Sequence, residues 1–151
     1  MNIKIKLVLF TITTIWLILI LYKIFLPLNS FFIKSYFVVD NMFGFVCHQQ
    51  DDKLLTIFGI KTMVCARCTG IYFGMFVGSI YILFFNVIKI KIKIFIFALL
   101  PILFDVIFIE INLYAYSKLI AFLTGFIFGV MLFLFLSTVI NSFYLERGRN
   151  K

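Results

Sequence analysis

Long apolar runs separated by short polar segments dominate the sequence. The runs cover residues 7–26, 69–88, 94–113 and 119–143, and a helix needs about 20 apolar residues to cross the hydrocarbon core of a bilayer. The pattern therefore predicts an all-α, polytopic membrane protein with about four transmembrane helices in one integral membrane domain, residues 1–151.

Two apolar stretches near the N-terminus need separate interpretation. The run 7–26 follows two lysines as a signal peptide would, but no small-residue cleavage site follows it, which predicts an uncleaved anchor. Residues 31–46 are apolar and aromatic but short, and Lys34 and Asp40 interrupt them. This stretch predicts an amphipathic helix that lies in the membrane interface.

The composition supports lipid as the main partner of the chain. Apolar residue types make up 64% of the 151 residues and charged types 13%, more apolar surface than a soluble domain of this size can bury. The formal net charge is +8. Because the basic residues flank the apolar runs, they predict topology signals beside anionic lipid rather than a nucleic-acid site.

The basic residues also predict the orientation in the membrane. With four spans, the N-terminus, the turn near residue 90 and the C-terminal tail share one side, which should be cytoplasmic. That side carries eight of the fourteen basic residues: Lys4, Lys6, Lys89, Lys91, Lys93, Arg147, Arg149 and Lys151. The protein is thus expected in the cell membrane with both termini cytoplasmic. A homo-oligomer is compatible with this arrangement.

A six-residue pattern, Thr-Gly-x-x-Phe-Gly, occurs at the start of the second run and again early in the fourth. Glycines four residues apart lie on one face of a helix and let two helix backbones approach closely in lipid. The pattern therefore predicts helix packing through Gly70, Gly74, Gly78, Gly125 and Gly129.

The polar segment 47–68 holds all three cysteines and the only histidine. The Cys65-x-x-Cys68 spacing lets two thiolates turn toward one tetrahedral ion, as in many zinc sites. Cys47 and His48 could complete the ligand set, although adjacent residues seldom bind the same ion. The segment predicts a metal site, with zinc as the expected ion and with Gln49 and Arg67 orienting the ligands.

Three other interpretations of the cysteines remain open. Copper is an alternative metal because thiolates bind it well, and Met42, Met63 and Met75 lie nearby in sequence, although they could be ordinary apolar filler. Cys65 and Cys68 could instead exchange disulfides, with Cys47 as the resolving thiol. A structural disulfide with one leftover thiol is the third interpretation.

Asp105 and Glu110 fall within the third apolar run. A carboxylate at the centre of a membrane helix costs roughly 2.5–3.5 kcal/mol on insertion scales and therefore usually faces a partner or a wet cavity. Arg67 is a possible counter-ion for Asp105, and Glu110 could simply lie at the interface. A carrier built around Asp105 is a further alternative function.

The motif Cys-His-Gln at 47–49, followed after fifteen residues by Cys-Ala-Arg-Cys-Thr-Gly-Ile-Tyr-x-Gly at 65–74, resembles the signature of small prokaryotic membrane proteins grouped as domain of unknown function 2085. The resemblance extends loosely over residues 40–135. An Arg-Ser pair usual in that family is replaced by Lys53 and Leu54, and a common Gly by Val106. The resemblance implies the fold and the site but no established reaction.

Overall fold

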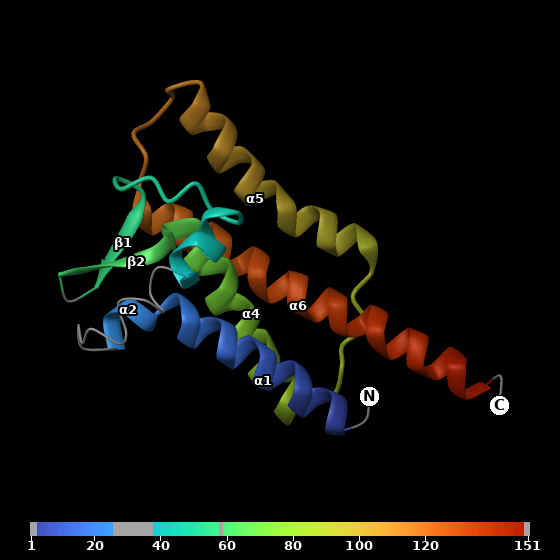
Figure 1. Cartoon of the computed structure of the whole chain (residues 1–151). Helices are drawn as coiled ribbons and strands as arrows, with labels where there is room; N and C mark the ends of the chain where they lie inside the picture. The colour runs from blue at the N-terminus through green and yellow to red at the C-terminus, as the bar shows by residue number, and fades with distance from the viewer. Residues whose placement is uncertain (1–2, 26–37, 58, 150–151) are drawn as a thin grey trace.

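The computed structural model describes residues 3–25, 38–57 and 59–149 and shows a mostly helical protein with one small sheet (Figure 1). In chain order the elements are α1 (Ile3–Ile20), α2 (Tyr22–Phe25), β1 (Leu54–Ile57), β2 (Ile60–Cys65), α4 (Ala66–Phe84), α5 (Ile92–Glu110) and α6 (Lys118–Arg149).

Four helices within the described residues are long and apolar enough to cross a membrane, which confirms the predicted number of spans. The spanning segments are Ile3–Ile20, Ala66–Phe84, Ile92–Glu110 and Lys118–Tyr144. The first three spanning segments begin and end a few residues before the corresponding apolar runs, and the fourth extends one residue beyond its run at each end. The predicted first run is divided, since α1 ends at Ile20 and the short α2 follows; its last residue lies outside the described part.

The predicted interfacial helix is described only from residue 38, and residues 31–37 lie outside the described part. Residues 38–44 are helical. Phe43 is buried at 3% exposure, whereas Met42 and Phe45 are exposed at 61% and 93%. This segment is therefore a short helix with Phe43 turned toward the core, and its location in the membrane interface stays a prediction.

The sheet is a feature that the sequence analysis did not predict. β1 and β2 form an antiparallel hairpin within the segment 47–68, with Ile57 opposite Ile60 and Leu54 opposite Cys65. Gly59 adopts a positive φ of 78° in the turn, which only glycine does without strain. An irregularity in register between Leu54 and Thr56 is bridged by Thr62, whose hydroxyl accepts a hydrogen bond from the Leu55 amide at 3.2 Å.

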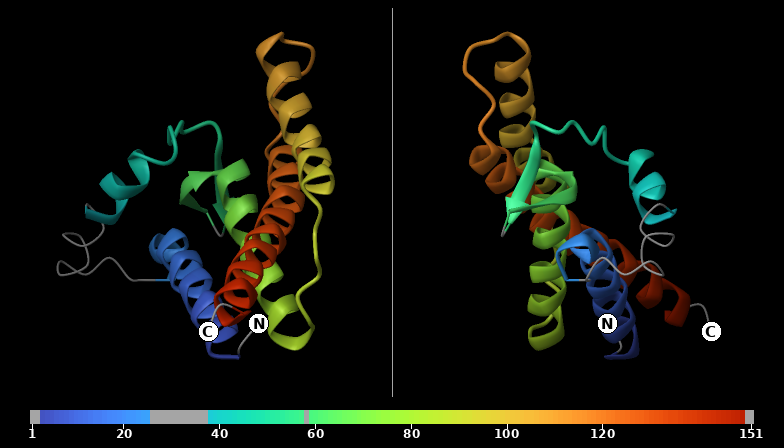
Figure 2. Two further views of the ribbon diagram at one scale, coloured as in Figure 1. Left: turned by 90° about the vertical axis from the view of Figure 1, so that its right-hand side faces the viewer. Right: turned by 60° about the vertical axis from the view of Figure 1, so that its left-hand side comes forward.

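The helix α4 lies between α1 and α6, and α5 packs against α6 (Figures 1 and 2). α4 and α6 approach so closely that side chains on the facing glycines would overlap the opposite backbone. Gly70 faces the carbonyl of Phe122 and Gly74 that of Phe126, so the contact advances in the same direction along both helices. The two helices are therefore parallel, and the repeated glycine pattern lies at their interface.

The contact between α1 and α4 uses polar and aromatic side chains. The hydroxyl of Thr13 donates to the hydroxyl of Ser79 at 3.0 Å in a buried hydrogen bond. One turn further along α1, the rings of Trp16 and Tyr72 lie 6.1 Å apart. Together with the α4–α6 contact, this interface fixes the end of α4 that carries the cysteines.

Candidate metal centre

Three thiols meet where the hairpin joins α4. The Sγ atoms of Cys47, Cys65 and Cys68 all lie within 4.8 Å of one another, and among the described residues they form the one group of this kind that could hold a metal ion. Three thiolates at about 2.3 Å from a tetrahedral zinc ion are separated by about 3.8 Å. The observed separations thus need only a small contraction to bind an ion.

Each thiol reaches this point from a different part of the chain. Cys65 is the last residue of β2 and Cys68 lies in the first turn of α4, so the strand-to-helix junction places both on one side. Cys47 comes from the segment that runs along the free edge of β2. There its Sγ accepts a hydrogen bond from the Cys65 amide at 3.2 Å.

Gln49 holds the Cys47 segment against β2. Its Nε2 donates to the carbonyl of Met63 at 3.0 Å and to the carbonyl of Asp40 at 3.2 Å. Its φ of 45° lies in the left-handed region that non-glycine residues seldom adopt, and such strain persists only where surrounding contacts enforce it. Gln49 therefore fixes the turn that delivers Cys47.

The hydrogen bonds among the thiols decide which one carries negative charge most readily. Hydrogen bonds from the side chains of Cys65 and then Cys68 lower the pKa of the Cys47 thiol far below its ordinary value. The hydrogen bond to Cys47 is the main cause that raises the pKa of Cys65. Cys47 is thus the first thiolate of the cluster, although it is only 6% exposed.

His48 lies outside the three-thiol cluster. Its side chain is exposed, and its ring nitrogens do not belong to the group formed by the three sulfur atoms. The structure brings together three of the four ligands predicted from the sequence.

Apolar side chains surround the thiols. Cys47 belongs to a buried cluster, against which the half-buried Cys65 and Cys68 pack. The other buried members are Ile20, Phe43, Met63 and Val64, and the partly buried ones are Leu19, Tyr22, Val39 and Tyr72. This largely apolar, partly solvent-accessible environment strengthens electrostatic interactions at the thiolates relative to bulk water.

Arg67, between the two cysteines of the Cys-x-x-Cys motif, forms an ion pair with Asp105 of α5. The Asp105 side chain is 3% exposed and that of Arg67 24%. The hydroxyl of Tyr114, in the loop after α5, donates to the second carboxylate oxygen, and this hydrogen bond raises the pKa of Tyr114. The turn that carries Cys65 and Cys68 is therefore tied to α5 and to the α5–α6 loop.

The α5–α6 loop supplies a second tyrosine to the same region. The ammonium group of Lys53 lies 5.6 Å from the centre of the Tyr116 ring, within the range of a cation–π interaction. Burial is the main cause that raises the pKa of Tyr116 to about 12. Neither tyrosine was predicted from the sequence as a site residue. The one feature of the sequence that could have indicated them is their position just after a span that carries a carboxylate.

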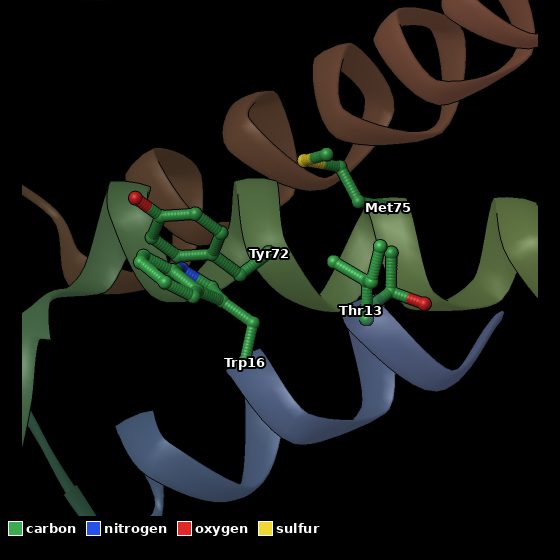
Figure 3. Close-up of a pocket in the computed structure, with 5 residues that line it drawn as sticks. Thr13, Trp16, Tyr72 and Met75 are labelled. Atoms are coloured by element: carbon green, nitrogen blue, oxygen red, sulfur yellow. The ribbon is translucent and has the colours of Figure 1, made fainter. Parts of the chain in front are cut away.

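A shallow hollow of about 160 Å³ lies between α1 and α4. Trp16, Tyr72 and Met75 form its walls with Ile12 and Thr13 (Figure 3). Tyr72 also packs against the thiol cluster, so the hollow and the cluster are neighbours. The walls are almost wholly apolar, which suits lipid contact.

Four apolar spans and a cluster of thiols at one end of α4 define an integral membrane protein with a candidate metal centre. The profile of the DUF2085 family, described as predicted membrane protein, matches residues 47–135. That match covers more than half of the chain and includes all three cysteines, Arg67 and Asp105. The chain belongs to the DUF2085 family.

Two archaeal proteins share part of this sequence. The chain is 39% identical over 92 residues to the uncharacterized protein MJ1492 of Methanocaldococcus jannaschii, an alignment that covers 58% of this chain and 59% of that protein. It is 38% identical over 39 residues to an uncharacterized protein of Methanothermobacter thermautotrophicus, covering 26% of this chain and 35% of that protein. Each alignment thus spans less than two thirds of the relative. No solved structure matches the chain significantly.

Proposed function

We propose that this membrane protein binds one transition-metal ion through the thiolates of Cys47, Cys65 and Cys68. The observation that supports the proposal is the mutual approach of the three Sγ atoms to within 4.8 Å. The thiols of Cys65 and Cys68, at the junction of β2 and α4, converge with that of Cys47 from the segment before the hairpin.

Zinc is the first candidate for this ion. Zinc takes thiolate ligands in tetrahedral geometry, and three thiolates leave one coordination position. A water molecule or a rearranged His48 would fill that position. Copper is the alternative, because soft sulfur ligands favour copper(I) as well.

Gln49, Arg67 and Asp105 would support the ligands without binding the ion. Gln49 fixes the segment of Cys47 through the Met63 carbonyl. Arg67 fixes the Cys65–Cys68 turn through Asp105. Residues that orient metal ligands in this way typically change metal affinity 10–100-fold when they are replaced.

The site is proposed to face the outside of the cell, with both termini in the cytoplasm. The support is the distribution of lysine and arginine: the residues near the start of α1, between α4 and α5, and after the fourth span share one side of the membrane. Short cytoplasmic loops carry an excess of such residues. The hairpin and the thiols lie on the other side, at the C-terminal end of α1 and the N-terminal end of α4.

Elemental analysis of the detergent-purified protein tests the metal site. We expect about one zinc or copper ion per chain in protein purified under reducing conditions without chelator, and none in a Cys65→Ser/Cys68→Ser variant. Absence of stoichiometric metal from the parent would contradict the proposal. A dithiol–disulfide shift on alkylation gels, in protein without metal, would instead support thiol–disulfide exchange.

A further inference from the structure

Met63 lies two residues before Cys65 in β2, within the stretch where the register of the hairpin is irregular. The carbonyl of Met63 accepts a hydrogen bond from Gln49, and the amide of Cys65 donates to the Cys47 sulfur. Both backbone groups thus point toward the segment 47–49, as the carbonyl of one residue and the amide two residues later do in an extended strand. The backbone of Met63 is therefore held directly beside the segment that carries Cys47.

Met63 is also buried within the cluster that contains the thiols. Its side chain is 3% exposed, and it belongs to the same buried cluster as Cys47, against which Cys65 and Cys68 pack. Apart from the two tyrosine hydroxyls, the remaining side chains of that cluster are hydrocarbon or aromatic. Because His48 is exposed, the Met63 thioether is the one soft donor besides the thiols in this cluster of the described residues.

A thioether distinguishes between the two candidate metals. Thiolates bind both copper(I) and zinc. The usual protein ligands of zinc are thiolate, imidazole and carboxylate, so a thioether adds more to a copper(I) site than to a zinc site. We propose that Met63 is a fourth sulfur ligand of the site, and that the complete set of Cys47, Cys65, Cys68 and Met63 binds copper(I) in preference to zinc. This inference rests on the proposed metal site and names its ion and its missing ligand.

The burial of the site agrees with a copper(I) ion. Cys47 and Met63 are both nearly inaccessible to solvent, whereas Cys65 and Cys68 are half-buried, so the ion would be shielded from solvent on the side of Cys47 and Met63. Zinc in the same place would take a water molecule or His48 as its fourth ligand, whereas copper(I) would take the Met63 thioether.

X-ray absorption at the copper edge tests the ligand directly. The full-length protein, labelled with selenomethionine and loaded anaerobically with copper(I) in detergent, should show sulfur and one selenium atom in the first shell of copper. The selenium should disappear in Met63→Leu and remain in Met75→Leu, the matched control in α4. A copper shell of sulfur alone in the parent protein would overturn the assignment of Met63.

Competition titrations with copper(I) and zinc chelators test the preference. Loss of Met63 should lower copper(I) affinity at least about tenfold, the lower end of what supporting residues contribute at metal sites, and should leave zinc affinity unchanged. An equal fall for both metals in Met63→Leu would show a packing role and would overturn the inference. Failure of the parent to bind either metal would instead overturn the metal site itself.

Discussion

Asp105 shows how a single side chain connects two helices of this protein. It is one of only two buried residues of α5, the other being Ala98, and it accepts hydrogen bonds from Arg67 and Tyr114. A carboxylate in a membrane span requires such partners. The pairing gives α5 a specific contact with α4 in addition to its packing against α6.

Replacing Asp105 with Asn should therefore destabilise the protein. The change leaves the buried guanidinium of Arg67 without its counter-charge, and breaking one side of a buried ion pair costs about 3–5 kcal/mol. We expect a loss near the lower limit, about 3 kcal/mol, because Arg67 is partly exposed. Thermal or denaturant unfolding in detergent would measure this loss.

Glu110→Gln is the matched control for that experiment, since Glu110 lies on the same helix and is exposed. It removes the same charge without breaking a buried pair and should change stability by less than about 0.5 kcal/mol. Equal effects of the two substitutions would contradict a specific role for the ion pair.

At the residue scale, the sequence identified most of the side chains that form the candidate metal site, but not how each of them is oriented. The Cys-x-x-Cys spacing predicted that Cys65 and Cys68 share one side, and the structure places Cys47 with them. The exposure of His48 could not be predicted, because the direction of a side chain next to a ligand depends on the local turn. Tyr114 and Tyr116 were not predicted, because the contacts of residues in the α5–α6 loop depend on how α6 packs back against α4.

Among the elements, the pair α4 and α6 has the closest contact. Gly74→Ala should destabilise this pair, because a Cβ atom at that position would overlap the carbonyl of Phe126. Backbone cannot move aside as a flexible side chain can, and overpacking of this kind costs about 1–3 kcal/mol. A lower unfolding temperature in detergent is the expected result.

Gly44→Ala is the control for the glycine experiment. Its Cβ atom would lie 3.6 Å from the nearest side-chain atom, an ordinary contact. Its helical segment should tolerate alanine well, since alanine is the better helix former. Comparable destabilisation by the two substitutions would argue against the close α4–α6 contact.

At the element scale, apolar periodicity and length were sufficient to predict four spanning helices. They were insufficient for the hairpin. β1 and β2 are only four and six residues long, and polar residues within them make the segment look like a loop. The β-branched residues Thr56, Ile57 and Ile60 around Gly59 were the available signal for a turn between strands.

At the scale of the whole molecule, the proposed orientation makes a simple prediction. On a cysteine-free background, Thr56→Cys in the hairpin should react with a membrane-impermeant thiol reagent in intact cells, whereas Ser142→Cys near the end of α6 should not. Both positions are exposed in the structure, so burial does not explain a difference. Labelling of Ser142→Cys alone would reverse the orientation.

The parallel contact of α4 and α6 also has a consequence for biosynthesis. The ribosome completes α4 and then α5 before α6 emerges, so the glycine face of α4 meets its partner last. A nascent chain that has not reached Lys118 already contains all three cysteines, yet it lacks the backbone carbonyls of Phe122 and Phe126 that pack against Gly70 and Gly74. The thiol cluster therefore acquires this support only after the first turns of α6 have been synthesised, and an intermediate stalled before that point would leave the glycine face of α4 without its partner.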